Sequence, residues 1–393
     1  MAKPAGRGNN LDSVRRHNLS TVLTITHHAG PVSRSDVTRE TGLNRSTVGA
    51  LVAELAALGL VTESGPNENL RVGRPSPVMS PNPRVAALAV NPEIDAVTVG
   101  LVGLDGRVQQ HRRVTVEHTP TPTEAVACAA TAIEGLMETA SVDRIVGIGV
   151  AMPGLVRADD GLVRRAPHLG WVDVDFAGML ADATGRPVAA ANDAQLGAYA
   201  EHLFGAGIGV AELIYVNGGS SGIGGGVISG GAAFTGSAGH AGELGHVRVG
   251  ASGSVDSGGI AGTLEAEVSR ARLLALLGLD SVDADGLRRA ILESHDPALT
   301  AEVRRQLGLL GGALATALTL FNPRLVVLGG FLATLYEADG ITLDRAVARA
   351  TLPETLEGVQ ITRTRLGSDI LLVGAAELAF EPLLADPAAF GTA

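Results

Sequence analysis

Residues 236–265 read GSAGHAGELGHVRVGASGSVDSGGIAGTLE and form the most informative segment of the chain. This segment places a carboxylate (Glu243), an imidazole (His246) and a second carboxylate (Glu265) on a scaffold rich in glycine. Glycine allows backbone to approach a small ligand closely. A few polar side chains on such loops suit a ligand whose hydroxyl groups need both donors and acceptors. The segment therefore predicts a site for a polyol.

The AGELGH core of this segment resembles the signature of the ROK family, which comprises bacterial repressors and sugar kinases. The resemblance implies that Glu243 and His246 contact a sugar. In the family, the histidine also ligates a structural zinc together with three cysteines in a C-x-C-G-x-x-G-C-x-E pattern. Here the frame is kept and every cysteine is replaced, because the pattern is filled by Asp256, Gly258, Gly259, Gly262, Thr263 and Glu265.

The loss of the cysteines requires another way to orient the ring of His246. Asp256 is a candidate hydrogen-bond partner for it. A zinc bound by His246, Asp256 and water is the alternative, but structural zinc sites generally use four side-chain ligands, mostly thiolates. We therefore expect no metal and no cofactor.

Composition favours a multidomain α/β protein. A chain of 393 residues exceeds what one hydrophobic core usually organises, and 46% hydrophobic residues supply ample core. A single cysteine, Cys128, excludes an intramolecular disulfide and a cysteine-rich metal site. The longest apolar run, residues 307–321, is shorter than the ~20 residues that a bilayer requires, and the N-terminus has no apolar signal core. We expect a cytoplasmic protein that does not enter a membrane.

The net charge of −11 is unevenly distributed. Residues 1–84 carry a net charge of +4 and the remainder carries −15. A basic N-terminal unit on an acidic body suggests that the first part meets a polyanion. A net charge of +4 is small enough to arise by chance, so charge alone does not decide this.

The N-terminal segment has the pattern of a winged helix-turn-helix. Apolar periodicity predicts a helix over 11–28, Ser33 and Gly42 delimit a short second helix, and Asn44 caps a third that Gly59 closes. The following segment LVTESGPNENLRVGRPSPVMSPNP predicts a strand, a turn and a strand, and it is similar to the wing of ROK regulators. A small helical domain whose Ser and Asn only cap helices is the alternative. We expect DNA contacts from Arg34, Asn44, Arg45, Ser46, Thr47, Arg71 and Arg74.

Strand-like and helix-like stretches alternate after residue 83 and begin again near residue 213, which favours doubly wound α/β layers. The resemblance implies the two-lobed actin-like ATPase (ribonuclease H-like) architecture. We predict a disordered tail over 1–10, a winged helix-turn-helix over 11–82, a first lobe over 83–200 completed by a C-terminal helix over 373–385, and a second lobe over 201–372. Residues 86–116 are predicted to form two strands joined by a turn at Asp105-Gly106.

Other segments add residues to the predicted site. Pro153-Gly154 ends a strand in VGIGVAMPGLV, and Asn192-Asp193 stands between a short strand and a helix. Taken alone, Pro153-Gly154 indicates a plain turn and Asn192-Asp193 indicates helix capping. The resemblance implies that Gly154, Asn192, Asp193, Glu243, His246 and Glu265 bind the sugar. It also places Asp193 where the kinases have their general base.

The phosphate-binding loops decide between a kinase and a regulator. The first loop of the family's kinases has a D-x-G-G-T pattern, which this chain fills with Asn91, Pro92, Glu93, Ile94 and Asp95. Proline lacks an amide donor, and the two carboxylates repel phosphate. The second loop, residues 220–225, is better kept. Because phosphoryl transfer depends on positioning and charge neutralisation, we expect no ATP use and no catalytic residue.

The sequence thus predicts a sugar-responsive repressor that binds operator DNA and a sugar or sugar phosphate as a homodimer or homotetramer. An ATP-dependent sugar kinase with an added DNA-binding head is the main alternative. A DNA-binding dimer with a vestigial sugar site is the third.

Overall fold

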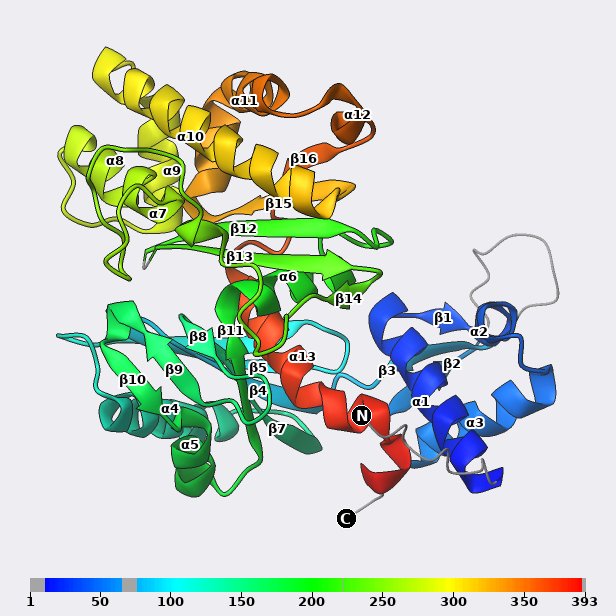
Figure 1. Cartoon of the computed structure of the whole chain (residues 1–393). Coiled ribbons are helices and arrows are strands. Elements are labelled where there is room, and N and C mark those ends of the chain that lie inside the picture. Colours follow the sequence, from blue (N-terminus) through cyan, green and yellow to red (C-terminus); the bar gives the residue numbers. More distant parts are fainter. Residues whose placement is uncertain (1–10, 66–75, 221, 391–393) are drawn as a thin grey trace, which may run out of the picture.

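The structure is a computed structural model that describes residues 11–65, 76–220 and 222–390. Figure 1 shows a small N-terminal head beside a body whose two lobes are stacked on each other. The predicted tail over 1–10 and the predicted wing residues Arg71 and Arg74 lie outside the described residues.

The head begins with the helices that the sequence predicted. They are α1 (Leu11–Ala29), α2 (Arg34–Thr41) and α3 (Arg45–Ala57). The side chain of Ser33 accepts a hydrogen bond from the N–H of Asp36 and caps α2, which ends at Gly42 in the left-handed conformation. The side chain of Asn44 accepts from the N–H of Thr47 and caps α3. The predicted caps are therefore confirmed.

A small antiparallel sheet completes the head. Its strands lie in the order β1-β3-β2 and are β1 (Val32–Ser33), β2 (Val61–Ser64) and β3 (Val78–Pro81). Met79 of β3 pairs with both Val32 and Glu63 and is fully buried. The pairing of β2 with β3 forms the base of a wing, as a winged helix-turn-helix requires.

The first lobe contains a sheet in the order β11-β7-β4-β5-β6. Strands β4, β7 and β11 are parallel, β5 pairs antiparallel with β4, and β6 pairs antiparallel with β5 at the edge of the sheet. Residues 85–115 therefore form β4, β5 and β6, and the prediction of two strands over this segment was wrong. Its physical reason is the turn after Pro92, where the N–H of Glu93 bonds to the C=O of Ala96. The elements of this lobe are β4 (Val85–Pro92), β5 (Ala96–Gly103), β6 (Val108–Thr115), α4 (Pro122–Met137), β7 (Arg144–Met152), β8 (Leu155–Val156), β9 (Val163–Ala166), η1 (Pro167–Leu169), β10 (Trp171–Val174), α5 (Phe176–Thr184), β11 (Val188–Asn192) and α6 (Asp193–Phe204).

The second lobe contains a sheet in the order β14-β13-β12-β15-β16. Its helices cover the face away from the first lobe (Figure 1). Residues 264–277 form two helices, because Val268 and Ser269 between them have extended backbone conformations. The elements are β12 (Leu213–Gly219), β13 (Gly222–Ser229), β14 (Ala232–Ala233), η2 (Leu244–His246), α7 (Leu264–Glu267), α8 (Arg270–Leu277), α9 (Ala284–Glu293), α10 (Pro297–Phe321), β15 (Leu325–Gly329), α11 (Gly330–Ala350), α12 (Pro353–Leu356) and β16 (Gln360–Arg363).

The chain ends in the first lobe. After η3 (Gly367–Asp369), helix α13 (Ile370–Ala385) packs between the first lobe and the head (Figure 1), and η4 (Pro387–Phe390) follows it. One continuous hydrophobic cluster runs from the head through α13 into the first lobe, and it includes Leu23, Leu55, Leu104, Leu196 and Phe380. The head is therefore held on the body by a shared core.

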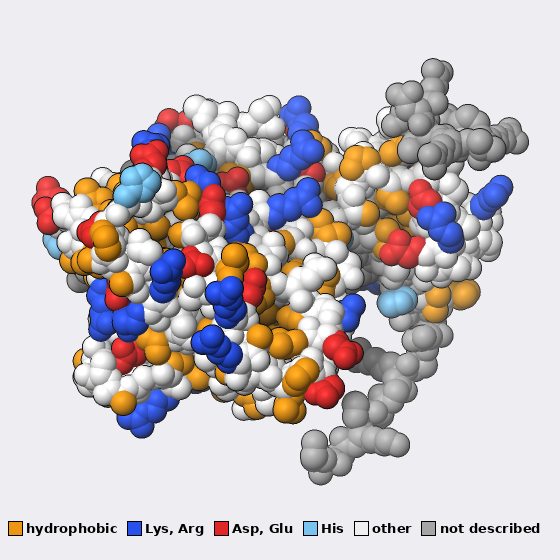
Figure 2. Space-filling model, turned by 90° about the horizontal axis from the view of Figure 1, so that it is seen from above, with side chains coloured by type: hydrophobic (Ala, Val, Ile, Leu, Met, Phe, Trp, Pro, Cys, Tyr) orange, Lys and Arg blue, Asp and Glu red, His pale blue; other side chains and the backbone are white. Residues whose placement is uncertain are grey.

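Within the described residues, no helix combines the length and the apolar content that crossing a bilayer requires. Figure 2 shows one face of the molecule, on which Lys and Arg side chains are interspersed with Asp and Glu side chains. The charge on this face is therefore mixed.

Candidate functional site between the two lobes

A pocket of about 310 Å³ lies between the lobes and brings the predicted ligand residues together. Gly154, Asn192 and Asp193 line it from the first lobe. Glu243, His246 and Glu265 line it from the second. Residues up to 111 positions apart in sequence therefore meet in one cavity.

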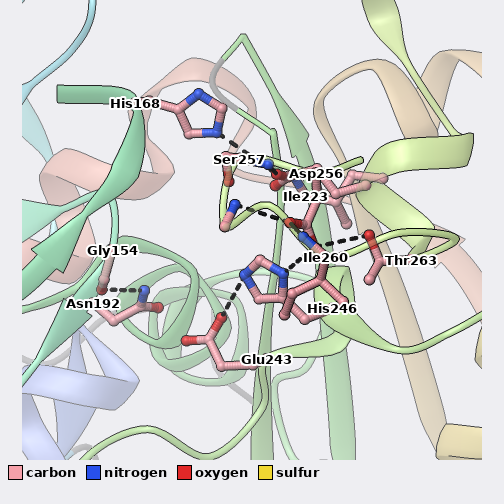
Figure 3. A network of polar contacts seen from close by, with 12 residues as sticks. Gly154, His168, Asn192, Ile223, Glu243, His246, Asp256, Ser257, Ile260 and Thr263 are labelled. Atoms are coloured by element: carbon pink, nitrogen blue, oxygen red, sulfur yellow. Dashed lines mark hydrogen bonds and ion pairs between the residues drawn. The ribbon is translucent and has the colours of Figure 1, made fainter. Parts of the chain in front are cut away.

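Gly154 and Asn192 form the floor of the pocket on the first lobe. Asn192 donates a hydrogen bond from Nδ2 to the C=O of Gly154 at 3.0 Å, and its Oδ1 accepts from the N–H of Gln195 (Figure 3). Asn192 thus caps α6 and holds the loop after β7 at the same time. Gly154 has φ +142°, and a Cβ there would lie 2.3 Å from the C=O of Arg165. Only glycine fits this close approach.

Asp193 lies at the first position of α6 and lines the pocket. Its Oδ1 accepts a hydrogen bond from the N–H of Ala194 at 2.7 Å. Burial raises its pKa to about 7, the hydrogen bond from Ala194 opposes the rise, and the charge of Glu243 adds to it. A carboxyl with this pKa can both donate and accept a hydrogen bond near neutral pH.

The ring of His246 is held by Asp256. His246 donates from Nδ1 to Oδ2 of Asp256 at 2.7 Å, and the hydroxyl of Thr263 donates to the same oxygen at 2.9 Å (Figure 3). The other oxygen accepts from the N–H groups of Gly258 and Ile260. Burial opposes the charge on Asp256, but these hydrogen bonds outweigh it and lower the pKa. The network fixes the proton of His246 on Nδ1 and leaves Nε2 free to face the pocket.

Glu243 lies beside His246 on the pocket wall. Its Oε2 is 4.0 Å from Nε2 of His246, and both side chains are about one third exposed. Burial raises the pKa of Glu243, and the neighbouring His246 opposes the rise. The two groups can bracket neighbouring hydroxyls of a ligand, one as a carboxylate acceptor and the other through a ring nitrogen.

Glu265 connects the two loops of the second lobe. Its Oε2 accepts from the N–H of Ile223 at 3.0 Å, and its Oε1 accepts from the N–H of Ser257 at 2.9 Å. Burial opposes its charge, but nearby His168 and these N–H groups outweigh burial and hold the pKa at about 2. Gly222 has φ +125°, and a Cβ there would lie 2.1 Å from Oε2 of Glu265. Glu265 is therefore a carboxylate whose position depends on a glycine.

The structure adds pocket residues that the sequence reasoning missed. His168 lies on η1 and reaches within 3.8 Å of Oε1 of Glu265, and Asn217 lines the pocket from β12. The signals were present, since His168 stands between Pro167 and Leu169-Gly170 in a short irregular segment. Asn217 lies near the carboxyl end of a buried strand, where ligands of α/β folds commonly bind.

Residues 91–95 stand at the positions of the first phosphate loop of the family's kinases, and their polar side chains already have partners within the chain. Asn91 is buried and donates to the C=O of Ala151. Arg113 pairs with Glu93 at 3.3 Å and with Asp95 at 2.8 Å. Burial raises the pKa of Glu93, and Arg113 opposes the rise. The turn therefore presents carboxylates and a proline where a phosphate would need amide donors.

The start of α3 is the candidate DNA-binding element. Asn44, Arg45 and Ser46 are exposed, and Thr47 is partly exposed. Arg34 differs, because its guanidinium forms two hydrogen bonds with the carboxylate of Glu63, at 2.7 and 2.5 Å. Arg34 would therefore reach DNA only by leaving Glu63, whereas Arg45 is available as it stands.

Comparison with known proteins agrees with this architecture. The model of the ROK family matches residues 89–381. The chain is 25% identical to a xylose repressor of Bacillus spizizenii over 94% of this chain and 97% of the relative. It is 30% identical to a glucokinase of Streptomyces coelicolor over 73% of this chain and 95% of the relative. A ROK family transcriptional regulator, a homologue of the E. coli MLC protein, has the same fold with a TM-score of 0.77 at 24% identity, covering 95% of this chain and 97% of that one.

The chain is a two-lobed α/β protein of the actin-like class with a winged helix-turn-helix head. It belongs to the ROK family.

Replacing Asp256 tests the network that holds His246. Asp256→Ala would leave donors of His246, Thr263, Gly258 and Ile260 without their acceptor. Because each buried unpaired donor costs about 1–3 kcal/mol and water can reach some of them, we expect the free energy of unfolding to fall by about 2–4 kcal/mol in urea titrations. The exposed Asp280→Ala should change it by less than about 0.5 kcal/mol. Equal stability of the two variants would contradict the role of Asp256.

The pKa of Asp193 predicts a pH-dependent stability. The folded protein holds this proton up to about pH 7, whereas the unfolded chain releases it near pH 4. Folding therefore becomes less favourable as the pH rises from 4 to 7, and the cost is complete above 7. Asp193→Asn cannot ionise. The free energy of unfolding of this variant minus that of the natural chain should therefore increase by about 2 kcal/mol from pH 5 to pH 8, measured by urea unfolding. The exposed Asp159→Asn should show no such gain.

Proposed function

We propose that this chain is a sugar-responsive transcriptional repressor, whose head binds operator DNA and whose interlobe pocket binds a sugar. One observation carries the proposal: an exposed helix start for DNA and a pocket of carboxylates, amides and an imidazole occur on one body whose head and first lobe share a core. The relation to a xylose repressor over nearly the whole length of both chains supports the same combination.

The pocket chemistry favours a neutral sugar over a sugar phosphate. Asp193, Glu243 and Glu265 face the cavity, and the low pKa of Glu265 keeps it charged. Arg165 also lines the cavity, but the three carboxyl groups outnumber it, so a phosphate would be repelled by them, whereas hydroxyl groups can donate to them. Asn192, His246 and the backbone around Gly154 supply the complementary groups.

We infer that this chain does not transfer a phosphoryl group. The turn over 91–95 carries Pro92 and the carboxylates of Glu93 and Asp95, which Arg113 already pairs. Among the described residues, the pocket lining includes Gly222–Gly224 of the second phosphate loop and none of the residues 91–95. A kinase needs both loops to position and neutralise the phosphates. The relation to a glucokinase keeps a sugar kinase as the second candidate.

A repressor of this kind is expected to act as a homodimer. Two copies related by a two-fold axis would place two α3 helices in successive major grooves of a two-fold related operator. The cytoplasm is the expected compartment, since the operator is there.

Sugar binding is the first test. Thermal unfolding with a panel of pentoses and hexoses should reveal a sugar that, at ~100 times its dissociation constant, stabilises the chain by ~2.7 kcal/mol. Glu243→Gln should weaken binding of that sugar by about 10- to 100-fold, because a hydrogen bond to a charged acceptor contributes about 1.5–3 kcal/mol. The exposed Glu357→Gln is the matched control and should bind normally.

The same mixtures separate the rival functions. If no sugar shifts the unfolding temperature, the pocket is vestigial and the proposal is wrong. If ATP and the bound sugar give steady ADP release that Asp193→Asn abolishes, the chain is a kinase.

Arg45→Ala tests the DNA-binding helix. With a duplex selected from a random pool by the natural chain, we expect about tenfold weaker binding in a gel-shift titration, because Arg45 is exposed at the start of α3. The unfolding temperature should stay unchanged. The control is Arg349→Ala, an exposed arginine on α11 of the second lobe, which should bind the duplex as the natural chain does. Unchanged affinity of Arg45→Ala would remove this residue from the interface.

A further inference from the structure

A cluster of histidines lies where the head meets the body, away from the interlobe pocket. His27 and His28 are at the end of α1, and Glu377 is on α13. The rings of His27 and His28 have centroids 5.0 Å apart. The rings of Phe204 and Phe380 pack edge-on around His27. His27 is fully buried and Glu377 is 3% exposed.

The contacts of His27 require a proton or a cation between its Nε2 and the carboxylate of Glu377. Its Nδ1 lies 2.5 Å from the C=O of Leu104, which can only accept, so the proton is on Nδ1. Its Nε2 lies 3.0 Å from both Oε1 and Oε2 of Glu377. If the ring of His27 were neutral, the lone pair of its Nε2 would face the carboxylate oxygens of Glu377, which is unfavourable. A second ring proton or a metal cation between the two groups resolves this conflict.

The arrangement of His27 matches that of a metal ligand. Ligating histidines usually donate their other ring N–H to a backbone carbonyl or a carboxylate, which fixes the ring and its tautomer. Leu104 accepts from His27 in this way. Imidazole and carboxylate together are donors that suit zinc and related transition metals.

His28 supplies a ring nitrogen with no other role. Its Nε2 is buried and has no hydrogen-bond partner among the described residues, a state that is uncommon for buried polar atoms. The nearby Nδ1 of His202, on α6, is also buried and unpaired among the described residues.

We propose that His27, His28 and Glu377 bind a Zn²⁺ ion that joins the head to α13. One ligand atom from each residue lies within 4.8 Å of the others. Zinc bonds of about 2.0–2.2 Å place tetrahedral ligand atoms about 3.4 Å from one another. Side-chain rotations that move the ligand atoms by about 1 Å would therefore bring all three into bonding distance of one ion. Water takes the remaining position. The site is separate from His246, where the sequence predicted no metal.

Zinc titration of the full chain tests this proposal. The chain is stripped with a chelator, dialysed and titrated with ZnCl₂ in competition with a chromogenic chelator. We expect one tight Zn²⁺ per chain and a higher unfolding temperature with zinc. His28→Gln should weaken this binding by at least about 100-fold, because it removes a ligand rather than an outer-shell partner. Its unfolding temperature without zinc should match that of the natural chain, since His28 makes no hydrogen bond through Nε2.

Two controls locate the ion. His17→Gln removes an exposed histidine from the same helix and should bind zinc as the natural chain does. His246→Gln should also retain the tight site. Absence of tight binding in the natural chain would show that His27 and Glu377 form only a buried ion pair. Equal affinity in His28→Gln, or a loss confined to His246→Gln, would likewise overturn the proposal.

Discussion

The carboxylate of Asp256 is the constraint on which the pocket wall of the second lobe depends. The loop after η2 is rich in glycine, and its Val255 and Ile260 are more than half exposed, so this part of the loop relies on hydrogen bonds for its shape. Asp256 accepts four of them, from His246, Thr263, Gly258 and Ile260. A metal bound by thiolates would fix the same loop by four bonds from one centre. A buried carboxylate with every lone-pair direction used achieves a similar closure without any cysteine in the loop, and it sets the tautomer of the histidine that faces the ligand.

Helix α6 carries the other half of the pocket and extends it toward the head. Its first turn holds Asn192 and Asp193 in the pocket, and its other end holds Glu201, which is fully buried. Glu201 accepts hydrogen bonds from Thr364 and from the N–H groups of Arg365 and Leu366, in the segment that leads from β16 of the second lobe into α13. Both α6 and α13 contribute to the hydrophobic cluster of the head. The pocket, the crossing between the lobes and the DNA-binding unit are thus connected by packed helices.

The sequence predicted which residues lie together in the pocket better than it predicted the contacts that each of them makes. The resemblance to the ROK family brought together Gly154, Asn192 and Glu265, but a single side chain often has two roles that a motif does not separate. Asn192 caps a helix, as one reading of that residue predicted, and it also holds Gly154, whereas its contact with a sugar stays a prediction. His168 was missed because its partner, Glu265, is 97 positions away and only the fold brings them together. The strand break at Glu93 was missed because a turn without glycine gives no strong signal. The helix caps of the head were predicted correctly because each depends on residues within one turn.

The shared core limits how a ligand could change DNA binding. The head and the first lobe are joined by buried residues of α1 and α13, so separating them would expose a large apolar surface. The free energy of sugar binding is too small to offset that cost. The pocket, in contrast, is lined from both lobes and carries polar groups on both walls. A ligand that contacts both walls binds best to one relative position of the lobes, and it shifts the equilibrium by its difference in affinity between positions. The first lobe and the head would then move together against the second lobe. In the proposed homodimer, such a motion would change the separation of the two α3 helices, and operator affinity would follow that separation because the grooves have a fixed spacing.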